Sequence, residues 1–247
     1  MDQNRTATQY QPIEGSPQLM ARLGGFLYLA IIAIGIFAEM FVRGRILVAG
    51  DAMATAANLR MNEALWRWGI AAELLGMICV VVLLLVWAVL LSPVSRQLTL
   101  LALFFDIVAH TVQVVALMQL VAALFPLDGA AYLEAFTPEQ LAALARMSGR
   151  AHGHGFGISL LFSGCFFLVA GYLIRKSGYL PRWIGVLYQI AGVGYIVNTF
   201  VLIVAPAWSG GIFRAVAPVI LVGEVSLAIW LLIKGIDQER WNRRQLT

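Results

Sequence analysis

Residues 65–91 read LWRWGIAAELLGMICVVVLLLVWAVLL, and Arg67 and Glu73 are the only charged side chains in this stretch. An α-helix rises about 1.5 Å per residue, so about 20 mainly apolar residues are enough to cross the hydrocarbon core of a bilayer. A helix formed by this stretch would be long enough to do so. The stretch therefore predicts a membrane-spanning helix, and this prediction decides the fold class.

The whole chain shares this apolar character. Of its 247 residues, 61% are hydrophobic and 12% are charged, and the mean hydropathy is +0.84. A typical soluble domain is about 45–50% apolar and about 25% charged. The composition excludes a disordered chain, a nucleic-acid-binding module and an ordinary cytosolic enzyme. The expected surroundings are a lipid bilayer, and no nucleic-acid partner is expected.

Six segments have the length and composition of a membrane span. They are residues 22–42, 65–91, 97–125, 152–174, 183–205 and 213–234. We therefore predict an all-α, polytopic bundle of six transmembrane helices that forms one domain over residues 22–234. A polar N-terminal tail (1–21) and a basic C-terminal tail (235–247) flank it.

Charge placement predicts which side of the membrane each loop faces. An even number of spans puts both termini on one side, and that side carries more Arg and Lys, above all at residues 175–182. The positive-inside rule then predicts cytoplasmic termini. The longer loops at 43–64 and 126–150 would face outward. Each is expected to hold a short amphipathic helix, begun by Asp51 in the first and by a capping box from Thr137 in the second, that partly covers the bundle.

Ionisable side chains inside the predicted spans are the strongest functional signal. A charge at the centre of a bilayer costs at least about 2.5–3.5 kcal/mol, so such residues usually mark a site. The candidates within or at the start of a span are Glu39, Glu73, Asp106, His110, Gln113, His152, His154, Asn198 and Glu224. Helix rise puts His110 and Glu224 near the midplane and most of the others nearer the outer face. The pattern predicts an outward-facing polar cavity rather than a continuous pore.

Two groups of these residues have informative spacing. Asp106, His110 and Gln113 stand at i, i+4 and i+7, so they share one helix face, and Asp106 could accept the second N–H of the imidazole. That would leave the other ring nitrogen for a metal or a proton transfer. His152 and His154 would point apart in a regular helix, but the alternate glycines around them permit either a distorted helix start or close helix packing.

The donor set indicates which cofactors to expect. Histidine and carboxylate ligands suit zinc, iron or manganese better than copper(I), and His110, His152 and His154 are the candidate metal ligands. Retinal needs a lysine in mid-membrane, whereas Lys176 and Lys234 lie at span ends, so retinal is not expected. A haem bridging His110 and His154 is not expected either, because their depths differ by about 13 Å.

The leading hypothesis is an integral membrane protein whose cavity binds a small amphiphilic ligand or a transition metal. In its most concrete form, a metal-bound water hydrolyses a lipid-like molecule. The catalytic candidates are His110, Asp106, Glu73 and Glu224, and the ligand-binding candidates are Glu39, Gln113, Asn198 and His154. Three alternatives stay open: a metal-free acid catalyst acting on an isoprenoid-like substrate, a proton-coupled transporter, and a structural or accessory subunit whose buried charges merely pair. The oligomeric state is left open as well.

Three stretches carry a family resemblance: RLGGFLYLAIIAIGIFAEMFVRG at 22–44, GDAMATAANL at 50–59 and HGHGFGISLLFSGCFFLVAGYLIRKSGYLPRWIGVLYQIAGVGY at 152–195. With them, most of the chain from about Arg22 to Trp230 resembles the bacterial membrane family known as domain of unknown function 4386. The resemblance implies a multi-pass protein of the bacterial plasma (inner) membrane. It implies no activity, so it assigns no role to any residue.

Overall fold

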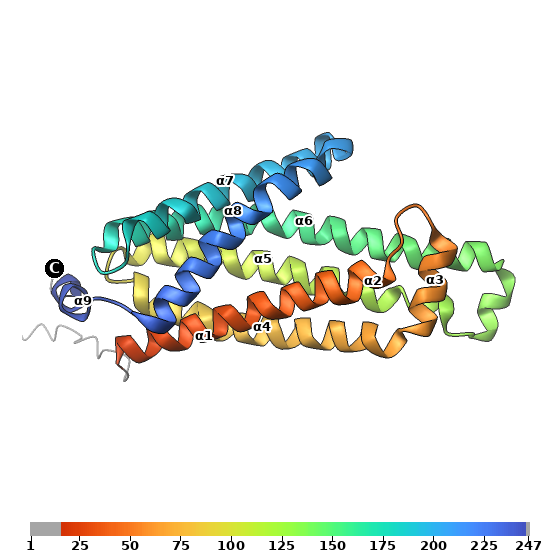
Figure 1. Ribbon diagram of the computed structural model, residues 1–247, viewed down its shortest axis with the longest axis horizontal. Coiled ribbons are helices and arrows are strands. Elements are labelled where there is room, and N and C mark those ends of the chain that lie inside the picture. Colours follow the sequence, from red (N-terminus) through yellow and green to blue (C-terminus); the bar gives the residue numbers. More distant parts are fainter. Residues whose placement is uncertain (1–15, 246–247) are drawn as a thin grey trace, which may run out of the picture.

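The computed structural model describes residues 16–245, and the regular structure in that range is helical throughout (Figure 1). The long helices are α1 (Pro17–Ile36), α4 (Glu63–Leu91), α5 (Arg96–Ala122), α6 (Pro138–Ser177), α7 (Arg182–Val204) and α8 (Pro206–Ile233). The short helical segments are η1 (Phe37–Arg43), α2 (Gly44–Ile46), α3 (Ala52–Met61), η2 (Phe125–Leu127), η3 (Ala131–Ala135) and α9 (Gln238–Gln245). The predicted all-α class is confirmed.

Six helices of the described chain are long and apolar enough to cross a membrane, so this is a multi-pass membrane protein. The first of them is one continuous stretch, Pro17–Ile46, made of α1, the π-helical η1 and α2. Large apolar side chains cover the outer surface of the helices; Leu75, Val81 and Phe104, for example, are each more than half exposed. Lipid chains solvate such side chains, while each helix satisfies its own backbone N–H and C=O groups.

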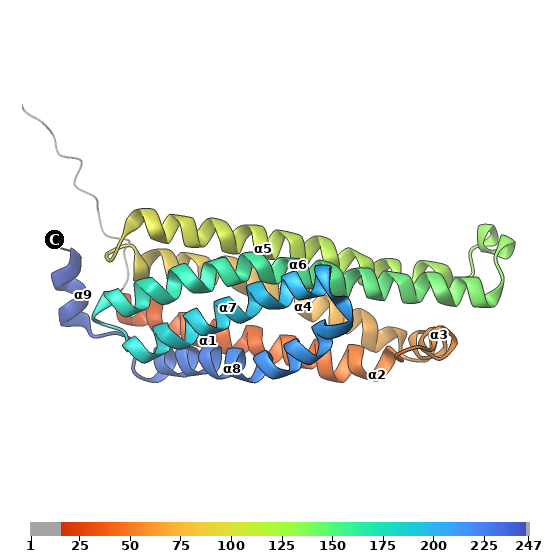
Figure 2. The same cartoon turned by 90° about the horizontal axis from the view of Figure 1, so that it is seen from above.

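The six long helices form a ring in which successive spans are neighbours. Contacts join α1 to α4, α4 to α5, α5 to α6, α6 to α7 and α7 to α8, and α8 returns to pack on α1. The start of α1 and helix α9 lie at one end of the bundle, named here the terminal end (Figures 1 and 2). Helix α3 and the α5–α6 connection lie at the opposite end, named the loop end, and α6 extends toward it well beyond α7 and α8.

Small residues bring the helices close together near the terminal end. Gly25 of α1 lies against backbone atoms of Ala228 and Leu232 in α8, and a Cβ atom at position 25 would overlap them. Gly171 of α6 and Gly185 of α7 face each other, and a Cβ on Gly171 would lie 2.6 Å from the carbonyl oxygen of Gly185. Lipid is as apolar as the helices, so such close van der Waals packing is a main source of helix association in membranes.

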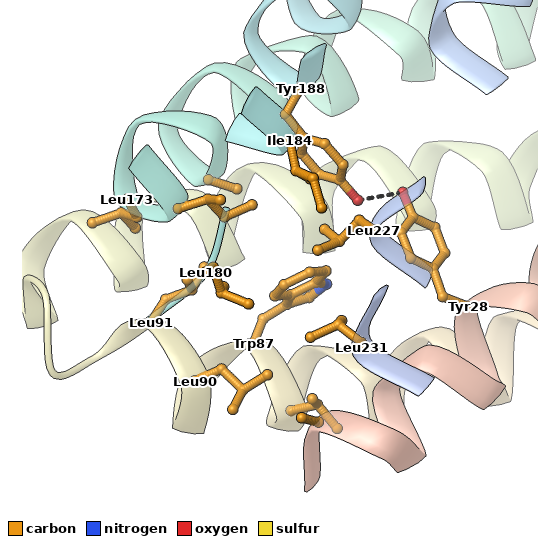
Figure 3. Close-up of a cluster of buried hydrophobic side chains, with 14 of the residues drawn as sticks. Tyr28, Trp87, Leu90, Leu91, Leu173, Leu180, Ile184, Tyr188, Leu227 and Leu231 are labelled. Carbon is orange, nitrogen blue, oxygen red and sulfur yellow. Dashed lines mark hydrogen bonds between the residues drawn. The ribbon is translucent and has the colours of Figure 1, made fainter. Parts of the chain in front are cut away.

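A buried cluster of aromatic and aliphatic side chains fills the terminal half of the ring (Figure 3). The rings of Tyr28 and Trp87 meet edge to face with centroids 6.4 Å apart, and the hydroxyl of Tyr188 donates to that of Tyr28 at 2.8 Å. Trp241 of α9 joins the same cluster. The segment 235–247, predicted as a tail, therefore contains a short helix that packs on the bundle.

Helix α6 is longer than the predicted fourth span. The capping box of Thr137 and Gln140 is present, but the helix that it begins is not a separate cover over the bundle and continues without a break to Ser177. Glycine in a helix costs about 1 kcal/mol relative to alanine. Gly155 and Gly157 sit against side chains of α5 and α7, so close packing offsets that cost. The prediction of a second short loop helix is therefore wrong: its residues form the first part of the continuous helix α6.

The first loop contains the short helix that was predicted. Helix α3 begins after Asp51, whose Oδ1 accepts the backbone N–H of Ala54 at 2.8 Å. It packs mainly on α6, and none of its residues lines the cavity described below. Most of the predicted N-terminal tail (1–21) lies outside the described residues, and from Pro17 onward it is part of α1.

Candidate functional site

An open cavity of about 790 Å³ lies inside the ring, and residues from all six spans line it. Helices α1 and α8 are in contact at Gly25 and diverge toward the loop end (Figure 1). Residues on either side of this divergence line the cavity, among them Ile36 of α1, Met40 of η1, and Phe213 and Leu221 of α8. The cavity therefore occupies the space that the two diverging helices leave.

The cavity ends on the packed core at its terminal side. Tyr28, Trp87, Phe166 and Phe167 belong both to the cavity wall and to the buried core cluster. The hydroxyl of Tyr28 in this floor accepts a hydrogen bond from that of Tyr188, which lies in the core behind it. The arrangement matches a cavity with one closed end and does not match a pore through the bundle.

Eight of the nine predicted site residues line this one cavity. They are Glu39, Glu73, Asp106, His110, Gln113, His152, Asn198 and Glu224. They come from α4, α5, α6, α7, α8 and the π-helical η1, so residues far apart in the sequence meet only through the packing of the ring. The ninth, His154, lies outside it.

Arg43 sits between two glutamates at the side of the cavity nearer the loop end. Its Nε donates to Oε2 of Glu39 at 2.7 Å, and its Nη1 donates to Oε2 of Glu73, also at 2.7 Å. The side chains of Arg43 and Glu73 are only 11% and 7% exposed, whereas that of Glu39 is 70% exposed. A buried ion pair needs such close geometry to offset the cost of desolvation. Arg43 is therefore paired with both carboxylates, and Oε1 of Glu39 has no hydrogen-bond partner among the described residues.

The segment that carries this pair is a π-helix, η1, rather than an α-helix. Short π-helical turns inside α-helices occur frequently at functional sites. Glu39 and Arg43 stand four residues apart, so they are neighbours on the same face of the helix, and Arg43 reaches across to Glu73 of α4. The pair thus ties η1 to α4 where the cavity wall is most polar.

Asp106 and His110 form a second polar pair, on α5. The Nδ1–H of His110 donates to the backbone carbonyl of Asp106 at 2.9 Å, and Oδ1 of Asp106 is farther away, at 3.4 Å. A carbonyl only accepts, so Nδ1 carries a proton and Nε2 stays without a hydrogen-bond partner among the described residues. The two residues are adjacent, as their spacing predicted, but the backbone carbonyl of Asp106 makes a shorter contact with the ring than its carboxylate does.

A third polar group joins α7 and α8. The hydroxyl of Tyr195 donates to Oε1 of Glu224 at 3.0 Å. Asn198, one turn along α7 on the same face, is 6% exposed, and its Oδ1 has no hydrogen-bond partner in the described chain. The ring of Phe167 meets that of Tyr195 edge to face at 5.4 Å. This part of the cavity combines a carboxyl group, an amide and aromatic rings.

The two histidines of α6 point apart, because the helix is regular there. His152 is 5% exposed, and its Nδ1 donates to the carbonyl of Ala116 at 3.1 Å. His154 is exposed, and its Nδ1 donates to the carbonyl of Arg150 on its own helix. The distorted helix start that would have aimed both histidines inward is not found.

The structure does not gather the three predicted metal ligands. His110 and His152 line the cavity on different helices, and His154 lies outside it. Within residues 16–245, no group of three or more His, Cys, Asp or Glu side chains is placed to hold a metal ion. Binding of zinc, iron or manganese stays a prediction.

Neither Tyr195 nor Arg43 was among the candidate site residues predicted from the sequence. Tyr195 could have been found, because it precedes Asn198 by three residues and so shares its helix face. The bridging position of Arg43 depends on how α4 packs against η1, and no local spacing encodes that contact.

Comparison with known proteins places the chain in a family. The model of the family described as "Domain of unknown function (DUF4386)" matches residues 23–235. No curated protein and no solved structure matches the chain. The match covers most of the ring and all of the cavity wall, so the chain belongs to the DUF4386 family.

Proposed function

We propose that this protein binds a small amphiphilic molecule in the cavity between α1 and α8. The observation that carries the proposal is the cavity itself. It has a volume of about 790 Å³ and is lined by both polar and apolar residues. Binding sites for small molecules are typically about 300–1,000 Å³ and mostly apolar, with a few polar groups that fix orientation. The cavity meets both criteria.

The walls suit a molecule with a polar head and an apolar tail. Glu39, Arg43 and Glu73 line the side nearer the loop end, while Trp87 and Phe166 line the floor at the terminal end. A purely polar solute would leave the aromatic floor uncovered, and a pure hydrocarbon would leave Oε2 of Glu224 and Oδ1 of Asn198, which have no partner among the described residues, unpaired. An amphiphile satisfies both regions at once.

The ligand reaches the cavity from the bilayer, between the diverging parts of α1 and α8. Met40 of η1, which continues α1, and Phe213 of α8 line the cavity and are also 65% and 39% exposed. Apolar side chains that belong to both surfaces make a continuous path from lipid to cavity. An amphiphile dissolved in the bilayer would then enter sideways without passing through water.

The proposed setting is the plasma membrane of a bacterium, with the termini in the cytoplasm. The short loop at 175–182 and the end of the chain carry a cluster of Arg and Lys, and cytoplasmic loops are enriched in these residues. The cavity would then open in the outer half of the bilayer. An alkaline phosphatase fused after Thr247 would be inactive in this orientation and active in the opposite one.

The proposal is confined to binding. A metal-bound water at His110 would need further ligands beside Asp106, and the described residues bring no third His, Cys, Asp or Glu side chain to them. Acid catalysis and proton-coupled transport stay predictions, because no contact in the cavity favours one of them over binding.

The test is photolabelling of the full chain in phosphatidylcholine nanodiscs, with dodecanol that carries a diazirine in its chain. Gly35 lines the cavity, and a Cβ there would have no heavy atom within 4 Å, so Gly35→Phe adds a ring to the cavity wall at a position where the Cβ has room. We expect labels on cavity-lining parts of α1 and α8 in the wild type and severalfold fewer in Gly35→Phe.

The matched control is Val81→Phe, which enlarges a side chain that is 66% exposed and lies outside the cavity wall. Its labelling should equal that of the wild type. If Gly35→Phe and Val81→Phe label the cavity as strongly as the wild type, or if labels fall only on lipid-facing residues, the proposal is wrong.

A further inference from the structure

We infer that the head group accepted by this cavity is an ammonium cation, held by Glu224, Asn198 and the Tyr195 ring. The inference rests on the proposed function, since it names the chemical class of the amphiphile that the same cavity binds. Charge, hydrogen-bonding capacity and an unpartnered buried amide each support it.

The charges of the wall favour a cation over an anion. Four carboxylates line the cavity, whereas Arg43 is the one Arg or Lys among its lining residues. Both Glu39 and Glu73 already accept hydrogen bonds from that guanidinium at 2.7 Å. A sulfate or phosphate head would have to displace two carboxylates from Arg43. An ammonium head would bind a carboxylate and would not have to displace one from Arg43.

Glu224 has the capacity to accept a further donor. Its Oε1 accepts one hydrogen bond from Tyr195, and Oε2 has no partner among the described residues. A carboxylate offers about four lone-pair positions, and a primary ammonium carries three N–H donors and no acceptor. A carboxylate in mid-membrane is normally paired with a cation, and no Arg or Lys of the cavity wall lies on α7 or α8 to do so.

Asn198 provides an independent sign of a missing partner. It lines the cavity on the helix face shared with Tyr195, it is 6% exposed, and its Oδ1 accepts no hydrogen bond from the described residues. Buried polar atoms are nearly always paired, so an unpaired atom in a cavity wall indicates a donor that the protein itself does not supply. An ammonium head in the cavity would bring that N–H donor to this residue.

The aromatic rings complete the site. Tyr195 and Phe167 line the cavity next to Glu224, with their rings edge to face at 5.4 Å. A cation near the face of an aromatic ring is attracted by the ring quadrupole, more strongly where water is excluded.

The experiment compares three diazirine probes with the same dodecyl chain and different heads: dodecylammonium, dodecanol and dodecyl sulfate. The full chain is labelled in phosphatidylcholine nanodiscs, and cavity labelling is divided by labelling around Val81, which faces lipid and corrects for partitioning. We expect about tenfold preference for ammonium over sulfate, the ratio that 1.4 kcal/mol produces. Dodecanol should fall between them.

Glu224→Gln is the deciding variant, because glutamine keeps the size of the side chain and can still accept from Tyr195. It should lose the preference for ammonium over dodecanol and over sulfate. Glu63→Gln is the matched control: its carboxylate pairs with Arg67, it lies outside this cavity, and the variant should keep the preference.

The remaining outcomes separate the two proposals. Equal cavity labelling by all three heads, or a preference that survives in Glu224→Gln, overturns the ammonium inference and leaves amphiphile binding standing. A preference for dodecyl sulfate overturns the ammonium inference, and Arg43 would then be the residue that binds the head group. Absence of cavity labelling by every probe overturns both proposals together.

Discussion

The terminal half and the cavity half of this bundle use the same helices in different ways. At the terminal end, Gly25 brings α1 against the backbone of α8, and aromatic and aliphatic side chains fill the interior. Toward the loop end the two helices diverge, and the interior is a cavity with polar residues on its wall. Close packing in the terminal half stabilises the fold. The other half can therefore contain an open cavity and charged side chains.

The two halves also differ in what their polar groups do. In the core, the hydroxyls of Tyr28 and Tyr188 satisfy each other. In the cavity, Arg43 holds Glu73, while Glu39, Glu224 and Asn198 have oxygen atoms without a hydrogen-bond partner among the described residues. Two buried atoms near the terminal end, Oγ1 of Thr99 and Nε1 of Trp241, also lack a partner there. The cavity differs because its atoms without a partner include carboxylate oxygens, which a bound ligand can pair.

The largest expected effect comes from removing the one cation of the cavity wall. Arg43→Leu leaves the carboxylate of Glu73, 7% exposed, without its partner. Breaking a buried ion pair in this way costs about 3–5 kcal/mol. The free energy of unfolding, measured by sodium dodecyl sulfate titration in mixed micelles, should fall by that amount.

The double variant Arg43→Leu/Glu73→Leu is the control, because replacing both members by apolar residues removes the unpaired charge. It should recover most of the lost stability. A double variant as unstable as Arg43→Leu would mean that the pair is not what holds η1 to α4.

The next effect concerns the contact that closes the ring. Gly25→Ala places a Cβ on backbone atoms of Ala228 and Leu232, which cannot move aside as a side chain can. We expect a loss of about 1–3 kcal/mol, measured by the same titration. Gly35→Ala, on the same helix with open space around its Cβ, should not lose stability. Equal losses at the two positions would show that helix propensity, and not the α1–α8 contact, sets the cost.

A smaller effect is expected from the hydroxyl pair of the core. Tyr188→Phe removes the donor to Tyr28 and leaves the packing of the ring in place, so the free energy of unfolding should fall by about 1 kcal/mol. In a double-mutant cycle, adding Tyr28→Phe should cost little more, because the shared hydrogen bond is already lost. Full additivity of the two losses would contradict the pairing.

The smallest effect is expected at Glu39. Its side chain is 70% exposed, and Arg43 keeps its bond to Glu73 when Glu39 is replaced. Glu39→Gln should therefore change stability by less than about 0.5 kcal/mol, as exposed ion pairs usually do. A loss comparable to that of Arg43→Leu would show that Glu39 is as much part of the scaffold as Glu73, and the contrast between the two halves would disappear.

The fold was predictable because its signal is local. Long apolar runs such as 65–91 have few alternatives to a membrane-spanning helix, and each of the six predicted spans overlaps a long helix of the structure. Boundaries were less predictable. The helix begun at Thr137 was expected to be short, but it continues to Ser177 because contacts with α5 and α7 offset its glycines.

The candidate site was predictable in its members and less so in its connections. Charged residues at membrane depth are rare, so rarity alone picked out Glu73, Asp106 and Glu224. The partners depend on helix rotation and packing, which one sequence does not reveal. The bridge from Arg43 to Glu73 and the bond from Tyr195 to Glu224 are examples. His154 was grouped with the site, and the regular geometry of α6 turns it away.

The central claim is that the space between α1 and α8 is a binding site and not merely a fault in packing. Saturation of photolabelling tests this most directly: diazirine-bearing dodecanol is competed with unlabelled dodecanol in nanodiscs, and labels are mapped to residues. If the cavity is a binding site, labelling at cavity residues such as Ile36 and Phe213 should fall to half of its uncompeted level at a finite concentration of unlabelled dodecanol. Labelling around Val81 should not saturate. If labelling at Ile36 and Phe213 fails to saturate, as labelling around Val81 does, the space between α1 and α8 is not a binding site.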